Sequence, residues 1–271
     1  MTKENVKAKN LIEALGFVKK QLENNYDYKV LAIYVQGSQN YNCDIYTDTY
    51  KSDIDMKAFV LPKPEDIYSN TMVSKKYETL YGQVEVKDFR LFTELVKKAN
   101  LTYLELLCTE FKLVDERIAE ATEGLADRIV IERQIPFLNA LRGTANQKYK
   151  GIFKATEISQ KILDKYGYQP KELHHLYRLF VLTKDVVFAK QKLSESYIPS
   201  EEHIKILINI KTGKEFGKDI EYVAEEGARL IKYIDWVINP LLEAKPEIIH
   251  KSINNFSKAL FNIFMEEIMK Y

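Results

Sequence analysis

The sequence predicts an α+β fold in which a small mixed sheet is followed by an all-helical module. Two observations support this prediction. Short β-branched and aromatic runs alternate with helical patterns over residues 1–115, whereas residues 116–271 show helical periodicity alone. We therefore expect two domains with these bounds, and a length of 271 residues is sufficient for both.

The mixed module is expected to begin with a helix and to alternate afterwards. Residues 5–22 carry apolar side chains at helical spacing, which is typical of an amphipathic helix. Residues 28–36 (YKVLAIYVQ) and 53–61 (DIDMKAFVL) each predict a largely buried strand. A further strand signal lies within residues 77–90, and two short helices are expected within residues 91–108.

The C-terminal module carries helix boundaries and no strand signal. Pro170 and Pro246 are each expected to open a helix, because proline is favoured in the first helical turn. Ser200 is placed as a helix N-cap. Gly213 and Gly217 are expected to separate the helix after Ser200 from the long helix that follows.

The composition is typical of a soluble globular protein, with 46% hydrophobic and 29% charged residues. The 40 basic and 39 acidic residues give a net charge of +1, which does not support a globally basic nucleic-acid binder. No apolar run is long enough to span a membrane, and we expect no secretory leader. The two cysteines have no framework spacing, so we expect a cytoplasmic protein.

Two carboxylates are expected to share one face of the strand at residues 53–61. Side chains two positions apart on a strand point the same way, so Asp53, Asp55 and Lys57 lie together. The opposite face, with Ile54 and Met56, is apolar and therefore packed. A hard divalent cation such as Mg²⁺ relieves the repulsion between two such carboxylates. The alternative interpretation is a solvated strand edge.

The Gly37–Ser38 dipeptide follows the first predicted strand directly. Glycine lets the backbone approach a ligand closely, and backbone N–H groups with a serine hydroxyl can hold a phosphate. A Gly-Ser turn alone is weak support for such a site. Its value comes from the order of the motifs, because a strand with Asp-x-Asp follows after a polar loop.

A third carboxylate would complete a two-metal site, and VEVKDFR offers two candidates. Glu85 and Asp88 have opposite strand parity, so one of them is expected to face the site. We favour Asp88, because Arg90 lies on the same face and can meet a phosphate. Glu85 would then be an exposed strand carboxylate. An N-cap role for Asp88 remains the alternative, which leaves Glu85 open as the third carboxylate.

These motifs resemble the nucleotidyltransferase superfamily typified by DNA polymerase beta. The closest resemblance is to predicted nucleotidyltransferases associated with RNA repair in bacteria and phages. Their pattern begins with Gly-Ser, a nearby Tyr and Ser-Asp-x-Asp, and continues with Asp-x-Arg, Lys-x-x-Asn and Glu-x-Leu. The matching positions are Gly37, Ser38, Tyr41, Ser52, Asp53, Asp55, Lys57, Asp88, Arg90, Lys97, Asn100, Glu105 and Leu107.

A second part of the resemblance lies in the helical module, within YGYQPKELHHLYRL. It is similar to a helical-domain signature that falls on Lys171, His175 and Arg178, whereas we expect His174 to be exposed. The alternative is a hydrogen-bond network between helices. Two features depart from the family pattern: the loop from Ser38 to Asp53 is longer than usual, and residue 101 is Leu where Pro is common.

The resemblance implies a polymerase beta-like palm that transfers a nucleoside monophosphate from an NTP to an acceptor. The implied cofactor is Mg²⁺, with Mn²⁺ as a substitute. The implied catalytic and metal-binding residues are Asp53, Asp55 and Asp88. The implied nucleotide-binding residues are Gly37, Ser38, Tyr41, Ser52, Lys57, Arg90, Lys171, His175 and Arg178.

Three functional hypotheses follow from the resemblance. The first is transfer to an RNA end, and the second is nucleotidylation of a protein or tRNA in an antitoxin-like role. The third is a catalytically silent member that binds nucleotide, RNA or a partner protein. The intact set of Asp53, Asp55 and Asp88 favours an enzyme, because inactive relatives tend to lose these carboxylates.

Overall fold

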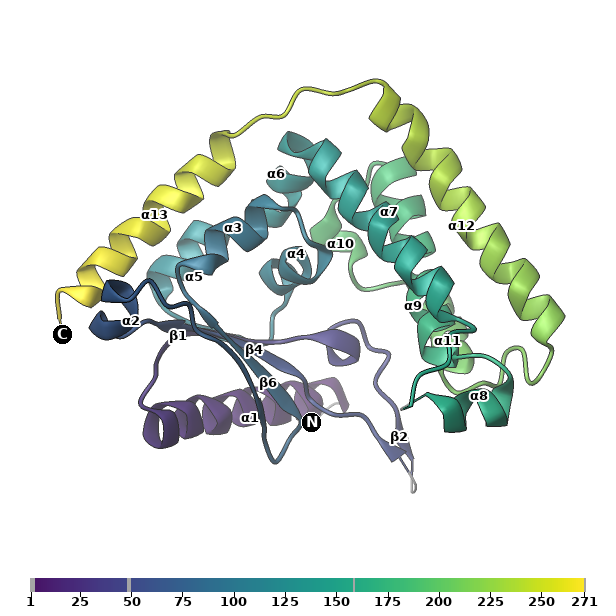
Figure 1. Cartoon of the computed structure of the whole chain (residues 1–271), viewed down its shortest axis with the longest axis horizontal. Helices are drawn as coiled ribbons and strands as arrows, with labels where there is room; N and C mark the ends of the chain where they lie inside the picture. Colours follow the sequence, from purple (N-terminus) through teal and green to yellow (C-terminus); the bar gives the residue numbers. More distant parts are fainter. Residues whose placement is uncertain (1–2, 48–49, 158, 271) are drawn as a thin grey trace. The chain divides into compact units, whose positions relative to one another are not determined.

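The computed structural model describes residues 3–47, 50–157 and 159–270. It has an α+β architecture, in which an N-terminal five-stranded mixed sheet with helices is followed by a largely helical C-terminal region (Figure 1). The predicted fold class is confirmed at this level. Within the described ranges, no helix is long and apolar enough to cross a membrane.

The central sheet has the strand order β5-β6-β4-β1-β7. Its strands are β1 (Lys29–Val35), β4 (Met56–Leu61), β5 (Ser74–Glu78), β6 (Gln83–Asp88) and β7 (Lys112–Val114). Neighbouring strands are antiparallel except β4 and β6, which are parallel. The strands β2 (Tyr46–Thr47) and β3 (Tyr50–Lys51) form a separate two-stranded sheet. The predicted strand over residues 53–61 therefore begins later than expected, at Met56.

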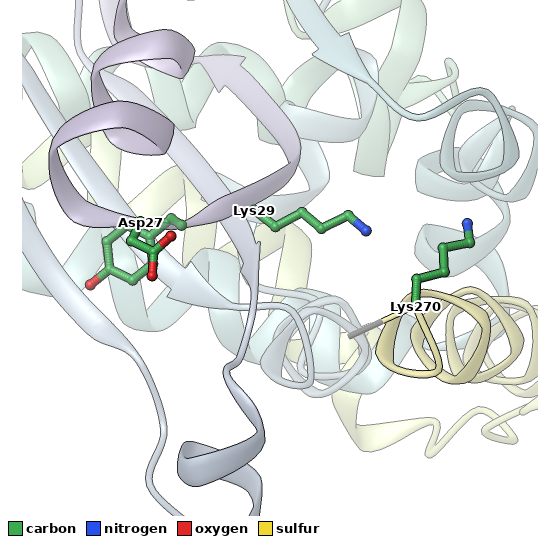
Figure 2. A pocket seen from close by; sticks show the side chains of 4 residues that line it. Asp27, Lys29 and Lys270 are labelled. Atoms are coloured by element: carbon green, nitrogen blue, oxygen red, sulfur yellow. The ribbon is translucent and has the colours of Figure 1, made fainter.

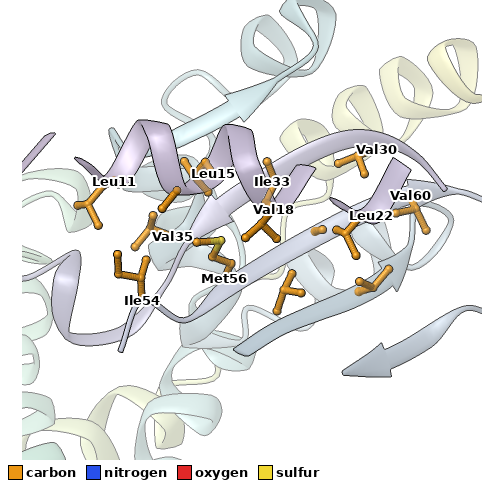
Figure 3. Packing of buried hydrophobic residues seen from close by; sticks show 14 of the residues in the cluster. Leu11, Leu15, Val18, Leu22, Val30, Ile33, Val35, Ile54, Met56 and Val60 are labelled. Atoms are coloured by element: carbon orange, nitrogen blue, oxygen red, sulfur yellow. The ribbon is translucent and has the colours of Figure 1, made fainter. Parts of the chain in front are cut away.

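One face of the central sheet is covered by α1 (Lys3–Tyr26). Leu15 and Val18 of this helix belong to one buried cluster with Ile33, Met56 and Val60 (Figure 3). Met56 and Val60 alternate with other residues along β4, as the period of a strand requires. Burying each such side chain contributes about 1.5–3 kcal/mol, so this face gives the sheet its hydrophobic core.

The other face of the sheet carries an aromatic core. Phe59 of β4 stacks on Phe92 with ring centroids 3.9 Å apart, and Phe92 meets Phe256 edge-on at 5.4 Å. These rings come from strand β4, from α3 (Leu91–Lys97) and from α13 (Lys251–Ile268). The helix α4 (Leu101–Cys108) adds Tyr103 beside Phe59. The last helix of the chain is therefore part of the core around the sheet.

The chain divides into two compact units that interleave along the sequence. The first unit comprises the described residues up to Asn40, Tyr46–Arg133 and those from Ile249 onward. It contains α2 (Pro64–Tyr68), α5 (Glu116–Thr122) and α6 (Leu125–Glu132) besides the helices named above. Residues 116–133 and 249–270, which we expected in the helical module, thus cluster with the sheet.

The second unit comprises Tyr41–Ile45 and Gln134–Ile248. Its helices are α7 (Gln134–Gly151), α8 (Gln160–Tyr166), α9 (Pro170–Leu182), α10 (Leu193–Ser196), α11 (Glu201–Lys211) and α12 (Ile220–Glu243). A π-helical stretch, η2 (Thr183–Phe188), continues α9.

Most of the predicted helix boundaries in the C-terminal region are found in the structure. Pro170 opens α9, and the Ser200 side chain caps α11 by accepting a hydrogen bond from the backbone N–H of His203. The prediction for Pro246 is wrong, because the last helix begins at Lys251. Local capping chemistry therefore fixes helix starts where a residue has the right partner within one turn.

Candidate active site

The Gly-Ser motif forms a short 3₁₀ turn, η1 (Gly37–Gln39), directly after β1. Gly37 has a φ of +77°, a left-handed conformation that costs other residues roughly 1–2 kcal/mol. A Cβ built on Gly37 would lie 3.9 Å from Oδ2 of Asp55. The structure therefore brings the Gly-Ser turn next to the Asp-x-Asp motif.

The two aspartates lie in the segment just before β4, and both are exposed. The backbone N–H of Gln36 donates to the carbonyl of Asp55 at 2.9 Å, and the N–H of Ile54 donates to the carbonyl of Tyr81 at 2.9 Å. Ile54 is 8% exposed and packs into the core, so its neighbours Asp53 and Asp55 point the other way. The segment is thus fixed on both sides while its carboxylates face solvent.

Two buried polar residues that the sequence analysis missed hold the turn in place. Gln39 Nε2 donates to the Tyr46 hydroxyl at 2.8 Å, and Asn40 Nδ2 donates to the Val35 carbonyl at 2.7 Å. Thr109 Oγ1 donates to Asn40 Oδ1 at 2.9 Å. In the sequence both residues look like ordinary polar loop positions, and only their burial in the structure distinguishes them.

The buried Lys57, two residues after Asp55, forms an ion pair with the half-buried Glu85. Lys57 is 4% exposed, and its Nζ lies 2.6 Å from Oε2 of Glu85 and 3.3 Å from the Tyr103 hydroxyl. The other oxygen of Glu85 meets Nζ of Lys87 at 2.7 Å. Burial alone would raise the pKa of Glu85, but hydrogen bonds from the two lysines hold it below its ordinary value. Burial lowers the pKa of Lys57.

The register of β4 and β6 separates Asp88 from the aspartates. Glu85 pairs with Lys57 in this register, whereas Asp88 pairs with Val60. Asp88 is therefore five residues along the strands from the level of Asp55, a distance of about 16 Å at 3.3 Å per residue. Its strand parity is that of the buried Val84 and Val86, which pack toward α1.

Asp88 is completely buried and is engaged by Arg90. The Arg90 side chain donates from Nε to Oδ1 at 2.9 Å and from Nη2 to Oδ2 at 2.8 Å. The backbone N–H groups of Arg90 and Val73 also donate to this carboxylate. The hydrogen bond to Asp88 raises the pKa of Arg90. The structure therefore places Asp88 and Arg90 away from the Gly-Ser turn, whereas Glu85 pairs with Lys57 at the end of the strands nearer to the aspartates.

The donor set at this site suits a hard divalent cation in part. Asp53 and Asp55 offer exposed carboxylate oxygens beside a glycine turn, which are the ligands such a cation prefers. The described residues contain no group of three or more His, Cys, Asp or Glu side chains arranged to hold a metal. Glu85 pairs with Lys57 in the register of β4 and β6, which places it closer to the level of Asp55 than Asp88 is. Its carboxylate is held by two lysines.

Two further predicted site residues, Ser52 and Tyr41, are both buried. Ser52 is 3% exposed, and its carbonyl accepts from Gln39 Nε2 at 3.5 Å. Tyr41 is 3% exposed and lies in the second unit, where the Arg178 guanidinium covers its ring at 4.0 Å. Neither the Ser52 side chain nor the Tyr41 ring is therefore open to a nucleotide in this structure.

The helical signature lies on α9 in the second unit. Lys171 is exposed, whereas His175 is half-buried and burial lowers its pKa well below the ordinary value. The expectation that His174 is exposed is wrong: it is 1% exposed, its Nδ1 lies 2.9 Å from the Leu207 carbonyl, and burial lowers its pKa to about 3. Lys171 is thus the accessible cation of this signature.

A cavity of about 260 Å³ lies beside the start of β1 (Figure 2). Its lining residues are Asp27, Tyr28, Lys29 and Lys270. Lys29 pairs with Leu61 at the far end of β4, six residues and about 20 Å from Asp55. This cavity is therefore separate from the candidate site.

No family model matches the chain, and no curated protein sequence matches it.

Proposed function

We propose that this chain is a Mg²⁺-dependent nucleotidyltransferase with a polymerase beta-like palm. In this proposal it transfers a nucleoside monophosphate from an NTP to an RNA end in the cytoplasm. The observation that supports the proposal most directly is the position of Gly37 beside Asp55, with Asp53 exposed next to them. A phosphate-binding turn and two carboxylates at one strand end suit the chemistry of an NTP with its cation.

Each group in the proposal has a distinct role. The backbone of the Gly37–Ser38 turn would bind the triphosphate, since a turn without a Cβ lets phosphate oxygens approach N–H groups. Asp53 and Asp55 would hold Mg²⁺, with Glu85 as the third carboxylate. When bound, the cation neutralises developing phosphate charge and favours deprotonation of the acceptor hydroxyl.

The lysines around Glu85 have a supporting role in this proposal. Lys57 and Lys87 keep the Glu85 carboxylate oriented on the face that carries the aspartates. Lys57 also contacts Tyr103: its Nζ donates to the Tyr103 hydroxyl and lies 4.4 Å from the centre of the Tyr103 ring. Asp88 and Arg90 are left out of the proposed chemistry, because each is engaged by the other away from the aspartates.

Incubation of the purified protein with Mg²⁺ or Mn²⁺ and each radiolabelled NTP, with and without total cellular RNA, tests the proposal. Label is expected in RNA, and Asp53→Asn and Asp55→Asn should each lower transfer at least about 100-fold without unfolding the protein. Unchanged transfer in either variant would exclude the proposed metal site. Label on the protein itself would instead indicate nucleotidylation of protein.

A second candidate function is binding without turnover. It is favoured by the two lysines that occupy both oxygens of Glu85, since this carboxylate must leave one of them to meet a cation. A silent binder should retain NTP binding in the Asp53→Asn variant and transfer no label under any condition. An enzyme should show the opposite result, with loss of turnover in the variant.

A further inference from the structure

The chain passes from the first compact unit to the second at the peptide bond between Asn40 and Tyr41, just after the Gly-Ser turn. Asn40 belongs to the first unit and is 4% exposed, whereas Tyr41 belongs to the second and is 3% exposed. Asn40 is fixed by its hydrogen bonds with Val35 and Thr109. The stretch Tyr41–Ile45, here called the Tyr41 segment, is packed with the helices of the second unit. Two consecutive buried residues are thus fixed in different units.

Three contacts hold the Tyr41 segment within the second unit. The Arg178 guanidinium lies 4.0 Å from the centre of the Tyr41 ring, which is a cation–π contact. Cys43 is fully buried in a cluster with Leu207. Lys211 Nζ donates to the Cys43 carbonyl at 2.9 Å. These contacts come from α9 and α11, so the position of the segment depends on both helices.

The two cations in these contacts are engaged within the second unit. Arg178 is 8% exposed, so little of its side chain is available to a ligand in solvent. Burial lowers the pKa of Lys211, whose ammonium is directed at a backbone carbonyl. A cation placed over an aromatic ring and a cation placed on a carbonyl both serve to fix a segment of chain.

We propose that Arg178 and Lys211 are positioning residues for the Gly-Ser turn. They fix the Tyr41 segment, and the peptide bond between Asn40 and Tyr41 transmits that restraint to residues 37–40. The consequence for nucleotide affinity rests on the proposed function, whereas the restraint itself does not. In an active enzyme, an arginine of the helical unit then sets how well the turn is shaped for a triphosphate.

Thiol labelling of Cys43 measures the restraint without any assay of activity. In a Cys108→Ser background, Cys43 is the single remaining thiol, and it is fully buried. Arg178→Met should raise its labelling rate at least tenfold, and Arg178→Lys should lie between this variant and the parent protein. Arg142→Met is the matched control, because Arg142 contacts Asn239 in the same unit and should leave labelling unchanged.

Hydrogen exchange resolved by overlapping peptides over residues 36–45 measures the effect on the turn. The proposal expects faster exchange at residues 38–40 in Arg178→Met than in the parent protein. Unchanged Cys43 labelling in this variant would overturn the role of Arg178. Faster labelling with unchanged exchange at residues 38–40 would overturn the link to the Gly-Ser turn.

Kinetics separate this inference from the proposed function. In an active enzyme, Arg178→Met should raise the KM for the NTP about fivefold to tenfold with kcat within twofold, and Arg178→Lys should restore part of the affinity. A loss of kcat at unchanged KM would contradict a positioning role. If the parent protein transfers no label, the proposed function fails, and the labelling and exchange results still decide whether Arg178 restrains the turn.

Discussion

At the residue scale, strand pairing favours Glu85 over Asp88 as the third carboxylate of the proposed site. Glu85 lies opposite Lys57, on the face of the sheet that continues toward the aspartates, whereas Asp88 is buried on the other side. A carboxylate held by two lysines stays ionised, and it has to leave one of them to meet a cation. A carboxylate enclosed by its own arginine and two backbone N–H groups suits a structural role.

Glu85→Gln and Asp88→Asn are therefore expected to have opposite effects. Glu85→Gln removes a charged oxygen from the proposed site and should lower transfer at least about 100-fold. Asp88→Asn leaves the Arg90 guanidinium without its carboxylate and should lower the free energy of unfolding by about 2 kcal/mol, with transfer per folded molecule little changed. Label transfer and chemical denaturation measure the two effects.

The exposed Glu78 on β5 supplies a control for Glu85. It contacts Gln83 at 2.8 Å, and Glu78→Gln should alter neither transfer nor stability appreciably. If Asp88→Asn abolishes transfer in a folded protein while Glu85→Gln does not, Asp88 must act in the chemistry after all. The register of β4 and β6 would then not describe the active arrangement.

At the scale of elements, the sequence predicts local features better than pairings. The start of α9 at Pro170 and the cap of α11 at Ser200 depend on residues within one turn, so a single sequence specifies them. The position of His174 does not, because its burial comes from α11, more than thirty residues further along the chain. Contacts of this kind are set by tertiary packing.

The positions of Glu85 and Asp88 depend partly on a local pattern and partly on strand pairing. Val84 and Val86 share the strand parity of Asp88, and their apolar side chains mark the core face of β6. This alternation indicates that Glu85 and Lys87 point away from that core, as Asp53 and Asp55 do in the segment just before β4. The parallel pairing of β4 with β6, which no local pattern specifies, was needed to place Glu85 beside Lys57.

The attachment of α13 to the sheet unit depends on a buried glutamate. The Glu267 carboxylate is 4% exposed and is shared by Lys270 at 2.6 Å, by Lys29 and by Arg117 at 2.8 Å. Hydrogen bonds from Lys270, Lys29 and Arg117 lower its pKa from 4.5 to about 2. The carboxylate therefore contributes stability that is complete above pH 4.5 and is lost as the pH falls toward about 2.

Glu267→Gln is expected to lower the free energy of unfolding by about 2–4 kcal/mol near pH 7, because it leaves three cations around a neutral group. The difference in Tm between parent and variant should shrink as the pH falls from 5 to 2.5, since protonation removes the same charge from the parent. Thermal unfolding followed by circular dichroism across this range measures it. Glu266→Gln is the control: its carboxylate is exposed and pairs with Arg117 at 2.6 Å, so the expected loss is below about 1 kcal/mol.

At the scale of the whole molecule, the second unit is an insertion into the first. The sheet unit is interrupted by Tyr41–Ile45 and again by Gln134–Ile248, and the chain returns to it at Tyr46 and at Ile249. Helical periodicity is the same in residues 116–133 and 249–271 as in the helices between them, so the pattern alone cannot assign a helix to a unit. Packing partners such as Phe92 and Phe256 make that assignment.

Native-state hydrogen exchange should show that α13 opens with the sheet and not with its neighbour in sequence, α12. Ile263 of α13 and Ile234 of α12 are both buried, so Ile→Val at either position removes one methylene and costs about 0.5–1.5 kcal/mol. Ile263→Val should lower the protection of slow amides in β1 and β4 and leave those of α12 unchanged, whereas Ile234→Val should do the reverse. Equal losses throughout the chain in both variants would mean that the two units unfold as one. That result would also count against a restraint that acts through the peptide bond between Asn40 and Tyr41. The Gly-Ser turn and the helices that hold Tyr41 would then open together.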